Sequence, residues 1–525
     1  MAENSRRLPV GIQSFQKIRE GNFLYVDKTD LVWKLANRGK QYNYLSRPRR
    51  FGKSLLVDTL QAYLEGNKVL FEGLKIMDLE KEWTKYPVIR MDMSLAGSSA
   101  EEIKSYFDDA FFGYEKKYGI ELYPGTSLTV RFKNIIHAAH EQAGQQVCIL
   151  IDEYDAPLQH SWKTDRHEEC TEVYRSVFSV LKSEDVHERF VFITGITKFT
   201  QISLFSVLNN LSNISFEPEY AAICGISKQE TVDDFMPEIE AMGEANGWTA
   251  DNAVAQLKAY YDGYHFSYDN MVDVFNPYSL INALTDKKLR NYWAASGATS
   301  MLPKFVDDME LRLGYFDDCY IDATTLETSD VTGGGAELFL YQSGYLTIKG
   351  YEDGVYHLGF PNEEVRQALN RIVVPALTMR TNAQVISNQS MLMRNLSIGN
   401  VNEAMKYLKA LIADVPYSNK KLASMDMEER YRLIISIIFN AIGYRVEVEH
   451  MLATGRIDVV VFATRFIYVI ELKLTKNGGL GSAEKQMLDR KYMEPFKADK
   501  RGVKGIAIEL DDLGKGLVNW KEIME

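Results

Sequence analysis

Cysteine is scarce in this sequence. Its four cysteines are spread over 525 residues, and no two of them have the CxxC spacing of a zinc or redox motif. The first ten residues, MAENSRRLPV, contain no apolar signal segment. We therefore expect a protein of the reducing cytoplasm.

Long apolar runs and an excess of positive charge are also missing. The longest apolar stretch, residues 433–442, is interrupted by Ser436 and Asn440. It is about half of the ~20 residues that a membrane span needs, so we expect no membrane contact. The chain has 60 Lys and Arg against 72 Asp and Glu, a net charge of -12. This charge excludes a polycation that coats nucleic acid, so any nucleic-acid contact must be local.

The remaining composition is that of an ordinary globular protein, with 46% hydrophobic and 25% charged residues. The length predicts three or four domains. Through about the first 230 residues, short β-branched runs alternate with helical spacing, which is typical of a parallel sheet wrapped by helices. The expected strands are 42–45, 88–91, 146–151 and 189–194. Ligands of such α/β sheets bind at the carboxyl ends of the strands.

The first of these strands leads into a candidate phosphate-binding loop, SRPRRFGKS at residues 46–54, followed by helical spacing. In a P-loop, backbone N–H groups and the helix N-terminus face the phosphates, Lys53 reaches the β/γ oxygens and Ser54 ligates magnesium. Arg47 replaces the first Gly of GxxxxGK[ST], so the GKS could instead only open a helix. The nucleotide-binding residues that we expect are Arg47, Pro48, Arg49, Arg50, Phe51, Gly52, Lys53 and Ser54. We expect one of the arginines to clamp phosphate, although all three could simply line a solvated loop.

A second motif supports nucleotide binding. The apolar run 146–151 ends in Asp152-Glu153, about 100 residues after GKS, and the pair is otherwise only a surface turn. Asp152 would hold magnesium through water, and Glu153 would polarise the water that attacks the γ-phosphate. Thr194, at the end of the fourth strand, either senses that phosphate or caps the strand. The expected cofactors are therefore ATP and Mg²⁺.

The C-terminal part shows an αβββαβ order. Its expected elements are a helix at 427–442, strands at 444–449, 456–462 and 466–473, a helix at 482–496 and a strand at 503–509. Asp458 lies on the second strand, and Glu471 and Lys473 lie on one side of the third. A hairpin across residues 463–466 places Asp458 almost opposite Glu471.

Two carboxylates so placed can share Mg²⁺ or Mn²⁺ while Lys473 holds or helps to deprotonate a water, which is the geometry of phosphodiester hydrolysis. The alternative is an exposed cross-strand salt bridge. The neighbouring positions are too apolar for an exposed hairpin, which favours the metal site. Glu449, or after it Glu429, would add a further acidic ligand. From residue 451 onward, 13 Lys and Arg against 11 Asp and Glu permit local DNA contact.

Histidines give no metal cluster from their spacing. His137 and His140 are three residues apart on one expected helix and lack a second pair. We expect a core or surface role for them.

Several motifs together resemble the bacterial AAA-ATPase-like family. They are YVDKT at 25–29, RPRRFGKS at 47–54, LIDEYDAPL at 150–158, FSVLNNLSNI at 205–214 and YDGYHF at 261–266, and the resemblance continues to FPNEEV at 360–365. In that family an arginine stands at the position of Arg47. The resemblance covers nearly the whole chain, and it implies a helical lid followed by a winged-helix-like module in the middle. Tyr and Trp residues there are expected to be core residues.

The αβββαβ part resembles the PD-(D/E)XK nuclease superfamily, whose site consists of residues of these types at these strand positions. Here Ile457 stands where the family pattern has proline. Gln486 and Tyr492 are similar to the QxxxxxY helix found beside that active site, so Gln486 joins Asp458, Glu471 and Lys473 as a candidate catalytic residue. The expected domains are 1–225 for the ATPase core, 226–375 for the lid and winged-helix-like region, and 376–525 for the nuclease-like domain.

The resulting hypothesis is a bacterial ATPase coupled to a magnesium-dependent nuclease that cleaves DNA, in defence or mobile-element biology. One alternative is a nucleotide-switched signalling scaffold whose nuclease-like domain binds nucleic acid without cleaving it. Another is a mobile-element protein that moves or protects DNA. The expected partners are a nucleotide, nucleic acid and, as an open possibility, further copies of the chain.

Overall fold

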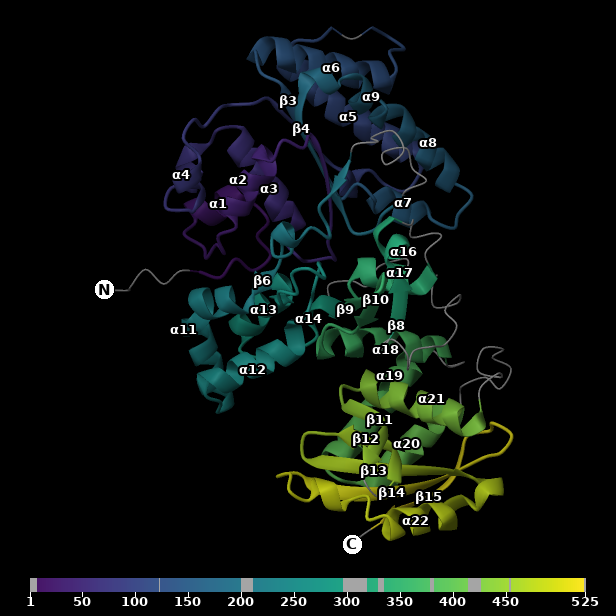
Figure 1. Ribbon diagram of the computed structural model, residues 1–525. Coiled ribbons are helices and arrows are strands. Elements are labelled where there is room, and N and C mark those ends of the chain that lie inside the picture. The colour runs from purple at the N-terminus through teal and green to yellow at the C-terminus, as the bar shows by residue number, and fades with distance from the viewer. Residues whose placement is uncertain are drawn as a thin grey trace. The chain divides into compact units, whose positions relative to one another are not determined.

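The computed structural model describes residues 7–121, 123–199, 211–295, 319–328, 335–377, 382–413, 426–452 and 455–523. These residues form two compact units, of which the first ends at Asn362 and the second begins at Glu363 (Figure 1). The expected ATPase core, lid and middle region therefore share one unit. The second unit begins before the expected boundary at 376, because helix α18 (Glu363–Leu377) packs against α21 (Met427–Ala441).

The first unit is built on a five-stranded parallel sheet in the order β2-β3-β4-β1-β5. Its strands are β1 (Tyr42–Ser46), β2 (Val88–Asp92), β3 (Val147–Asp152), β4 (Glu188–Gly195) and β5 (Ser212–Asn213). The parallel α/β prediction is thus confirmed, and the four expected strands match the first four within two residues. β4 lies between β1 and β3, and every residue of β3 is buried.

Several helices pack around this sheet. α3 (Lys53–Leu64) packs on β3, while α5 (Ala100–Tyr118), α6 (Leu128–Ala143) and α8 (His167–Phe178) pack together. α5 starts with a capping box between Ser99 and Glu102 and ends at Gly119, whose φ of 64° favours glycine. Arg131 of α6 pairs with the buried carboxylate of Glu115 at 2.7 Å, which joins α5 to α6.

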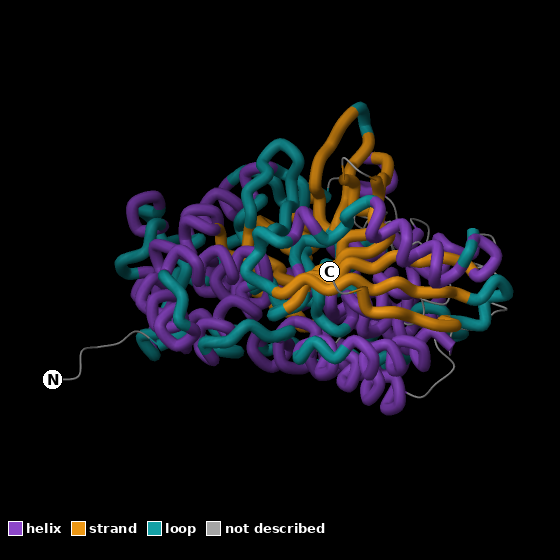
Figure 2. Tube along the Cα trace, turned by 90° about the horizontal axis from the view of Figure 1, so that it is seen from below, coloured by secondary structure: helices purple, strands orange, loops and turns teal. Residues whose placement is uncertain are grey.

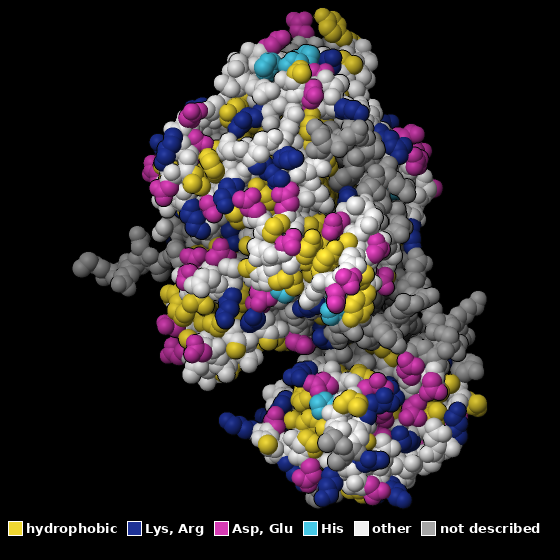
Figure 3. Space-filling model, viewed as in Figure 1, with side chains coloured by type: hydrophobic (Ala, Val, Ile, Leu, Met, Phe, Trp, Pro, Cys, Tyr) yellow, Lys and Arg dark blue, Asp and Glu magenta, His cyan; other side chains and the backbone are white. Residues whose placement is uncertain are grey.

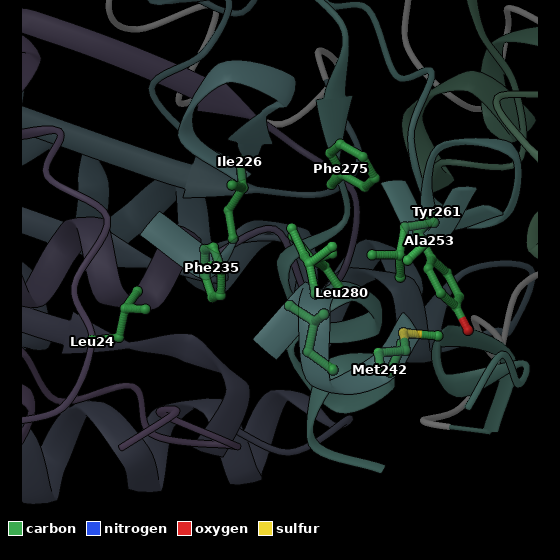
Figure 4. Close-up of a cluster of buried hydrophobic side chains, with 12 residues drawn as sticks. Leu24, Ile226, Phe235, Met242, Ala253, Tyr261, Phe275 and Leu280 are labelled. Atoms are coloured by element: carbon green, nitrogen blue, oxygen red, sulfur yellow. The ribbon is translucent and has the colours of Figure 1, made fainter. Parts of the chain in front are cut away.

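A helical region follows, formed by α11 (Lys228–Asn246), α12 (Ala250–Tyr261), α13 (Pro277–Asp286) and α14 (Tyr292–Ala295). Its buried core includes Phe235, Met242, Ala253, Tyr261 and Leu280, and Leu24 of the N-terminal segment joins the same cluster (Figure 4). Burial of these side chains anchors the N-terminal segment to the helices, which form the expected lid.

Next comes a three-stranded antiparallel sheet in the order β8-β10-β9, with strands Cys319–Asp322, Val355–Gly359 and Thr347–Glu352. Helices α16 (Ala323–Thr328) and α17 (Gly335–Ser343) accompany it, as expected for a winged-helix-like module. Tyr345, Tyr356 and Trp293 are buried, in agreement with the expected core role of such residues. The motif residues 205–210 lie outside the described residues.

The second unit holds a mixed sheet in the order β11-β12-β13-β14-β15, in which β13 and β14 are parallel and the other pairs antiparallel. These strands are among those drawn in orange in Figure 2. α19 (Asn382–Ser397) and α20 (Val401–Ala413) precede α21, which contacts β11, β12 and β13. The strands are Arg445–Leu452, Gly455–Phe462, Phe466–Leu474, Gly502–Leu510 and Leu517–Ile523.

Two features of this unit differ from the sequence prediction. The helix expected at 482–496 is α22 (Gly479–Asp489), followed by a short 3-10 turn at Glu494–Phe496. The helix stops early because Lys491 adopts a φ of 51°, which an α-helix cannot accommodate. The sequence prediction does not include β15, which pairs with β14 and is the last strand of the sheet. The αβββαβ order itself is confirmed.

Burial of Asp262, just after α12, yields a testable pH dependence of stability. The side chain is fully buried, and burial, with Asp273 nearby, raises its pKa to about 6. Since the unfolded carboxyl has a pKa of about 3.9, the folded chain binds the proton more tightly, and the free energy of unfolding falls as pH rises from about 4 to 6. The loss is up to about 3 kcal/mol, at about 1.4 kcal/mol per pH unit.

Asp262→Asn should therefore remove this fall, measured as the midpoint of urea unfolding at pH 5 and pH 7.5. Asp251→Asn, an exposed position on α12, is the control and should behave like the unmodified chain. An equal pH dependence in Asp262→Asn and the control would contradict the assignment.

Candidate functional sites

The phosphate loop lies between β1 and α3. Gly52, the residue before α3, has a φ of 89° that favours glycine, and Arg50 has a φ of 67°. Among the described residues, no side chain caps the first turn of α3, which also contains no acidic residue. The N–H groups of this turn can therefore receive an anion such as a phosphate.

Lys53 is the first residue of α3, and its side chain is 5% exposed. Its Nζ donates to the carbonyl oxygens of Arg47 at 2.9 Å and Pro48 at 3.1 Å. Burial lowers the pKa of Lys53, and the carboxylates of Glu153, Asp155 and Asp152 oppose this shift. The ammonium group is thus held beneath the loop and close to the acids at the end of β3.

Asp152 and Glu153 stand at the carboxyl end of β3. Asp152 is 1% exposed, and Glu153 adopts a φ of 47° that turns the chain sharply there. Burial raises the pKa of both carboxyls; a hydrogen bond from Ser54 opposes the shift at Asp152, and the charge of Lys53 opposes it at both. Lys53, Ser54, Asp152 and Glu153 are therefore brought together as the motif spacing predicts.

A cavity of about 420 Å³ opens over this loop. Its polar lining includes Arg49, Arg50, Lys53, Ser54 and Glu153. The Arg50 guanidinium lies 4.9 Å from the ring centre of Tyr278, a lid residue. The remaining wall is mainly apolar and comes from the N-terminal segment and the lid, including Ile12, Leu24, Val26, Phe235 and Ile281. A cavity lined both by charged loop residues and by apolar side chains suits a nucleotide.

Arg47 does not line this cavity, although the sequence suggested it as a phosphate clamp. The side chain is 1% exposed, and its guanidinium donates to the carbonyls of Ser215 at 2.9 Å and Tyr220 at 3.0 Å. It also lies 4.1 Å from the ring centre of Phe266. Arg47 therefore ties the loop to distant backbone. Its guanidinium is held away from any phosphate bound in the cavity.

Pro48 and Thr194 also face away from the cavity. Pro48 packs against Gly344, where an added Cβ would come within 2.5 Å of it. The Thr194 hydroxyl donates to the Leu45 carbonyl at 2.9 Å and is fully buried, so it acts as a strand contact rather than a phosphate sensor.

The sequence prediction missed Asp155. Its carboxylate accepts hydrogen bonds from the Thr197 amide and hydroxyl, both at 2.6 Å, and from the Ile196 amide. It therefore fixes the loop after β4 beside the phosphate loop. The acidic DEYD sequence at the end of the β3 run is the sequence feature that points to Asp155.

In the second unit, Asp458 of β12 and Glu471 of β13 meet at the end of their ladder. Val459 pairs with Ile470, and Asp458 Oδ2 accepts a hydrogen bond from the Leu472 amide at 2.9 Å. Glu471 is fully buried, and Lys473 Nζ lies 3.1 Å from its Oε1. The expected juxtaposition of these three residues is what the structure has.

Burial and mutual repulsion control the charges of this group. Burial, with the charge of Asp458, raises the pKa of Glu471 to about 7, and burial also raises the pKa of Asp458. Lys473 opposes both shifts. Burial disfavours the charged form of Lys473, but the two carboxylates and Glu428 raise its pKa overall.

Two residues of α21, Glu428 and Arg432, join this site without having been singled out in the sequence. Glu428 lies 3.6 Å from Lys473 Nζ, and Arg432 lies 3.4 Å from Asp458. Glu449, the expected additional ligand, is bound by Arg432 at 2.5 Å and by Arg456 at 3.1 Å. Its carboxylate is therefore already neutralised by arginines in this structure. The only sequence signal for Glu428 was its place in the first turn of the helix.

Gln486 and Tyr492 form a chain of hydrogen bonds. Gln486 Nε2 donates to the Tyr492 hydroxyl at 3.1 Å, and that hydroxyl donates to the Arg456 carbonyl at 2.9 Å. The pair therefore holds the start of β12, two residues before Asp458. This contact suits a positioning role for Gln486.

None of the helices in the described part of the chain has the length and apolar character that a membrane span requires.

Known proteins resemble this chain in both parts. Residues 9–205 match the family model of a predicted AAA-ATPase, and residues 426–520 match that of the PD-(D/E)XK nuclease superfamily. The curated "Uncharacterized protein in vnfD 5'region" of Azotobacter chroococcum is 30% identical over 535 residues, which cover 98% of each chain.

Solved structures resemble it only distantly. The Aeropyrum pernix ORC2 protein has 12% identity and a TM-score of 0.27, covering 66% of this chain and 92% of its own. A chain of Drosophila ORC bound to DNA and Cdc6 has 7% identity and a TM-score of 0.24, covering 82% and 62%. Scores this low establish no shared fold. The identity along the whole length does establish kinship: the chain belongs to the family of the Azotobacter protein, and it combines a predicted AAA-ATPase domain with a PD-(D/E)XK nuclease superfamily domain.

Proposed function

We propose that this protein binds and hydrolyses ATP and, under the control of that nucleotide, cleaves DNA in a metal-dependent reaction. The observation that carries the nuclease proposal is the buried pair of Asp458 and Glu471 with Lys473 beside it. Two adjacent buried carboxylates repel each other, and Lys473 and Arg432 offset this only in part, since the pKa of both carboxyls stays raised. Such an arrangement suits a site that takes a further cation.

The carboxylates fit a divalent metal. Apart from the ion pair with Lys473, no donor among the described residues satisfies either oxygen of the buried Glu471. These oxygens, with those of Asp458, are the hard ligands that Mg²⁺ and Mn²⁺ prefer. When bound, such a cation would activate water and stabilise the charge that develops on the phosphate.

Lys473 then has a role of its own. Its ammonium group, 3.1 Å from Glu471 and 3.6 Å from Glu428, is placed to hold a water or a phosphate oxygen at the carboxylate pair. Gln486 and Tyr492 keep the start of β12 in position. Arg432 could pass from Asp458 to a DNA phosphate, since both are anions that arginine binds.

The ATP roles follow from the cavity. Lys53 would exchange its loop carbonyls for the β/γ-phosphate oxygens, and Arg49 or Arg50, which line the cavity, would clamp phosphate. Ser54 and Asp152 would hold Mg²⁺, and Glu153 would orient the attacking water. The apolar wall would take the base.

The lid and the middle module contact the phosphate loop directly, which supports control by the nucleotide. Trp293 of α14 donates from Nε1 to the Arg49 carbonyl at 3.3 Å. Gly344, after α17, packs on Pro48 and has a φ of 88°. A change in the loop on nucleotide binding therefore reaches both parts of the first unit.

One assay separates this proposal from a scaffold that binds nucleic acid without cutting it. The full chain is incubated with plasmid, linear and single-stranded DNA and with RNA, with and without Mg²⁺ and ATP. We expect DNA cleavage that requires Mg²⁺. Binding without cleavage of any substrate would instead favour the scaffold.

Control by ATP gives a further expected result. Lys53→Ala should change the cleavage rate several-fold, because a ligand that shifts a conformational equilibrium binds its two states with affinities that differ by ~1 to 3 kcal/mol. Lys104→Ala, an exposed position on α5, should leave the rate unchanged. Equal cleavage by Lys53→Ala and the control at every ATP concentration would make the two domains independent enzymes.

A further inference from the structure

Three potential metal ligands converge in the first unit, and none of them belongs to either proposed site. His137 lies on α6, while Glu184 and His187 lie in the segment that follows α9 (Val180–Ser183) and leads into β4. Their ligand atoms all lie within 4.8 Å of one another. Histidine side chains gather on the surface at the top of Figure 3, where Figure 1 places α6.

We propose that His137, Glu184 and His187 form a binding site for a transition-metal ion of the zinc type. Two imidazoles and a carboxylate are a ligand set that Zn²⁺, Ni²⁺ and Cu²⁺ prefer, whereas Mg²⁺ and Ca²⁺ prefer oxygen alone. The site is separate from the proposed ATPase and nuclease chemistry. None of its residues lines the nucleotide cavity.

The distances suit such an ion. Metal–ligand bonds of about 2.0–2.1 Å in a tetrahedron place the ligand atoms roughly 3.3 Å apart. His187 Nδ1 lies 3.2 Å from Glu184 Oε2, and His137 Nε2 lies 2.5 Å from the same oxygen. Only a small outward rotation of the exposed His137 ring is needed, because 36% of that side chain is accessible.

Glu184 is the buried anchor of the group. Its side chain is only 3% exposed, whereas the two histidines are at the surface, so the carboxylate is fixed and the imidazoles close over it. Lys133 Nζ also approaches Glu184, at 3.2 Å from Oε1. That contact uses the other carboxylate oxygen and leaves Oε2 for the ion.

His140 lies beside this group. Its Nδ1 donates to the Gln145 carbonyl oxygen at 3.0 Å, because that oxygen can only accept. Metal-bound histidines commonly donate their second nitrogen to a backbone carbonyl in this way. The ring centre of His140 lies 5.0 Å from that of His187, and that of His137 lies 4.5 Å from it.

Such an ion would fasten α6 to the segment that enters β4. The two are 47 residues apart at His137 and Glu184, so the ion would close a long loop of the chain and stabilise the fold. We therefore assign the site a structural role.

Zinc binding to the full chain tests the proposal. The protein is freed of metal with a chelator and titrated with ZnCl₂ by calorimetry and with Co²⁺ by visible absorption, in the Asp458→Asn and Glu471→Gln background so that the carboxylate pair does not compete. We expect one Zn²⁺ per chain, a higher melting temperature with Zn²⁺, and the Co²⁺ absorption bands of a tetrahedral site with nitrogen ligands.

His137→Ala and His187→Ala should each weaken zinc binding at least 10-fold and remove the shift in melting temperature. His160→Ala, an exposed histidine on α7 (Ala156–Ser161), is the matched control and should bind like its parent. Glu184→Gln serves as a second variant if a histidine variant is poorly folded, because it keeps the size of the side chain. Equal zinc affinity in all variants, or binding only at millimolar zinc, would overturn the site.

Discussion

Replacing Lys473 by alanine is expected to lower DNA cleavage by about 10³-fold and to leave ATP hydrolysis nearly unchanged. The Lys473 ammonium group is 3.1 Å from Glu471 and 3.6 Å from Glu428, so its loss removes the cation that pairs with the buried Glu471. A positioned proton donor or charge of this kind contributes about 10² to 10⁴-fold to a rate. Cleavage is measured on plasmid in single turnovers, and ATP hydrolysis by phosphate release.

Lys476→Ala provides the matched control for this change. Lys476 is three residues further on and exposed, so its removal changes the net charge equally without touching the carboxylates. Lys473→Met tests for a merely structural effect, since it keeps the aliphatic stem and should be as inactive as alanine. Wild-type cleavage by Lys473→Ala would refute the assigned role.

Glu153→Gln should retain ATP binding and lose hydrolysis by about 10² to 10³-fold. The side chain stands at the end of β3 and lines the cavity, where a carboxylate can polarise water and an amide cannot. Glutamine adopts the φ of 47° at this position about as readily as glutamate does, so the turn itself should persist. Lys53→Ala, in contrast, should weaken ATP binding, because it removes the cation that would meet the phosphates.

Binding is measured by calorimetry and hydrolysis by phosphate release, in the same preparations. Glu172→Gln, on the exposed side of α8, should match the unmodified chain in both. If Glu153→Gln lost binding and hydrolysis to the same degree, Glu153 would hold the nucleotide rather than the water.

Local patterns in the sequence predict the secondary-structure elements of this protein and the side-chain groupings that depend on them. The apolar run of β3 predicts a buried strand, and Asp152 and Glu153 directly after it must stand at its end. The short turn between β12 and β13 sets the register, so Asp458 and Glu471 had to meet. In both cases the residues are close together in the chain, so local backbone geometry fixes their relative positions. The pattern of apolar residues predicts that geometry.

Contacts between residues that are far apart in the chain become visible only in the folded structure. Arg47 looked like a phosphate ligand, yet its partners Ser215 and Tyr220 lie about 170 residues away and bury it. In the sequence, His137 and His140 are not accompanied by a second pair of potential ligands. Folding places Glu184 beside His137. Such contacts depend on how separate elements pack. The spacing of residues along the chain does not indicate which contact will close a loop of many residues.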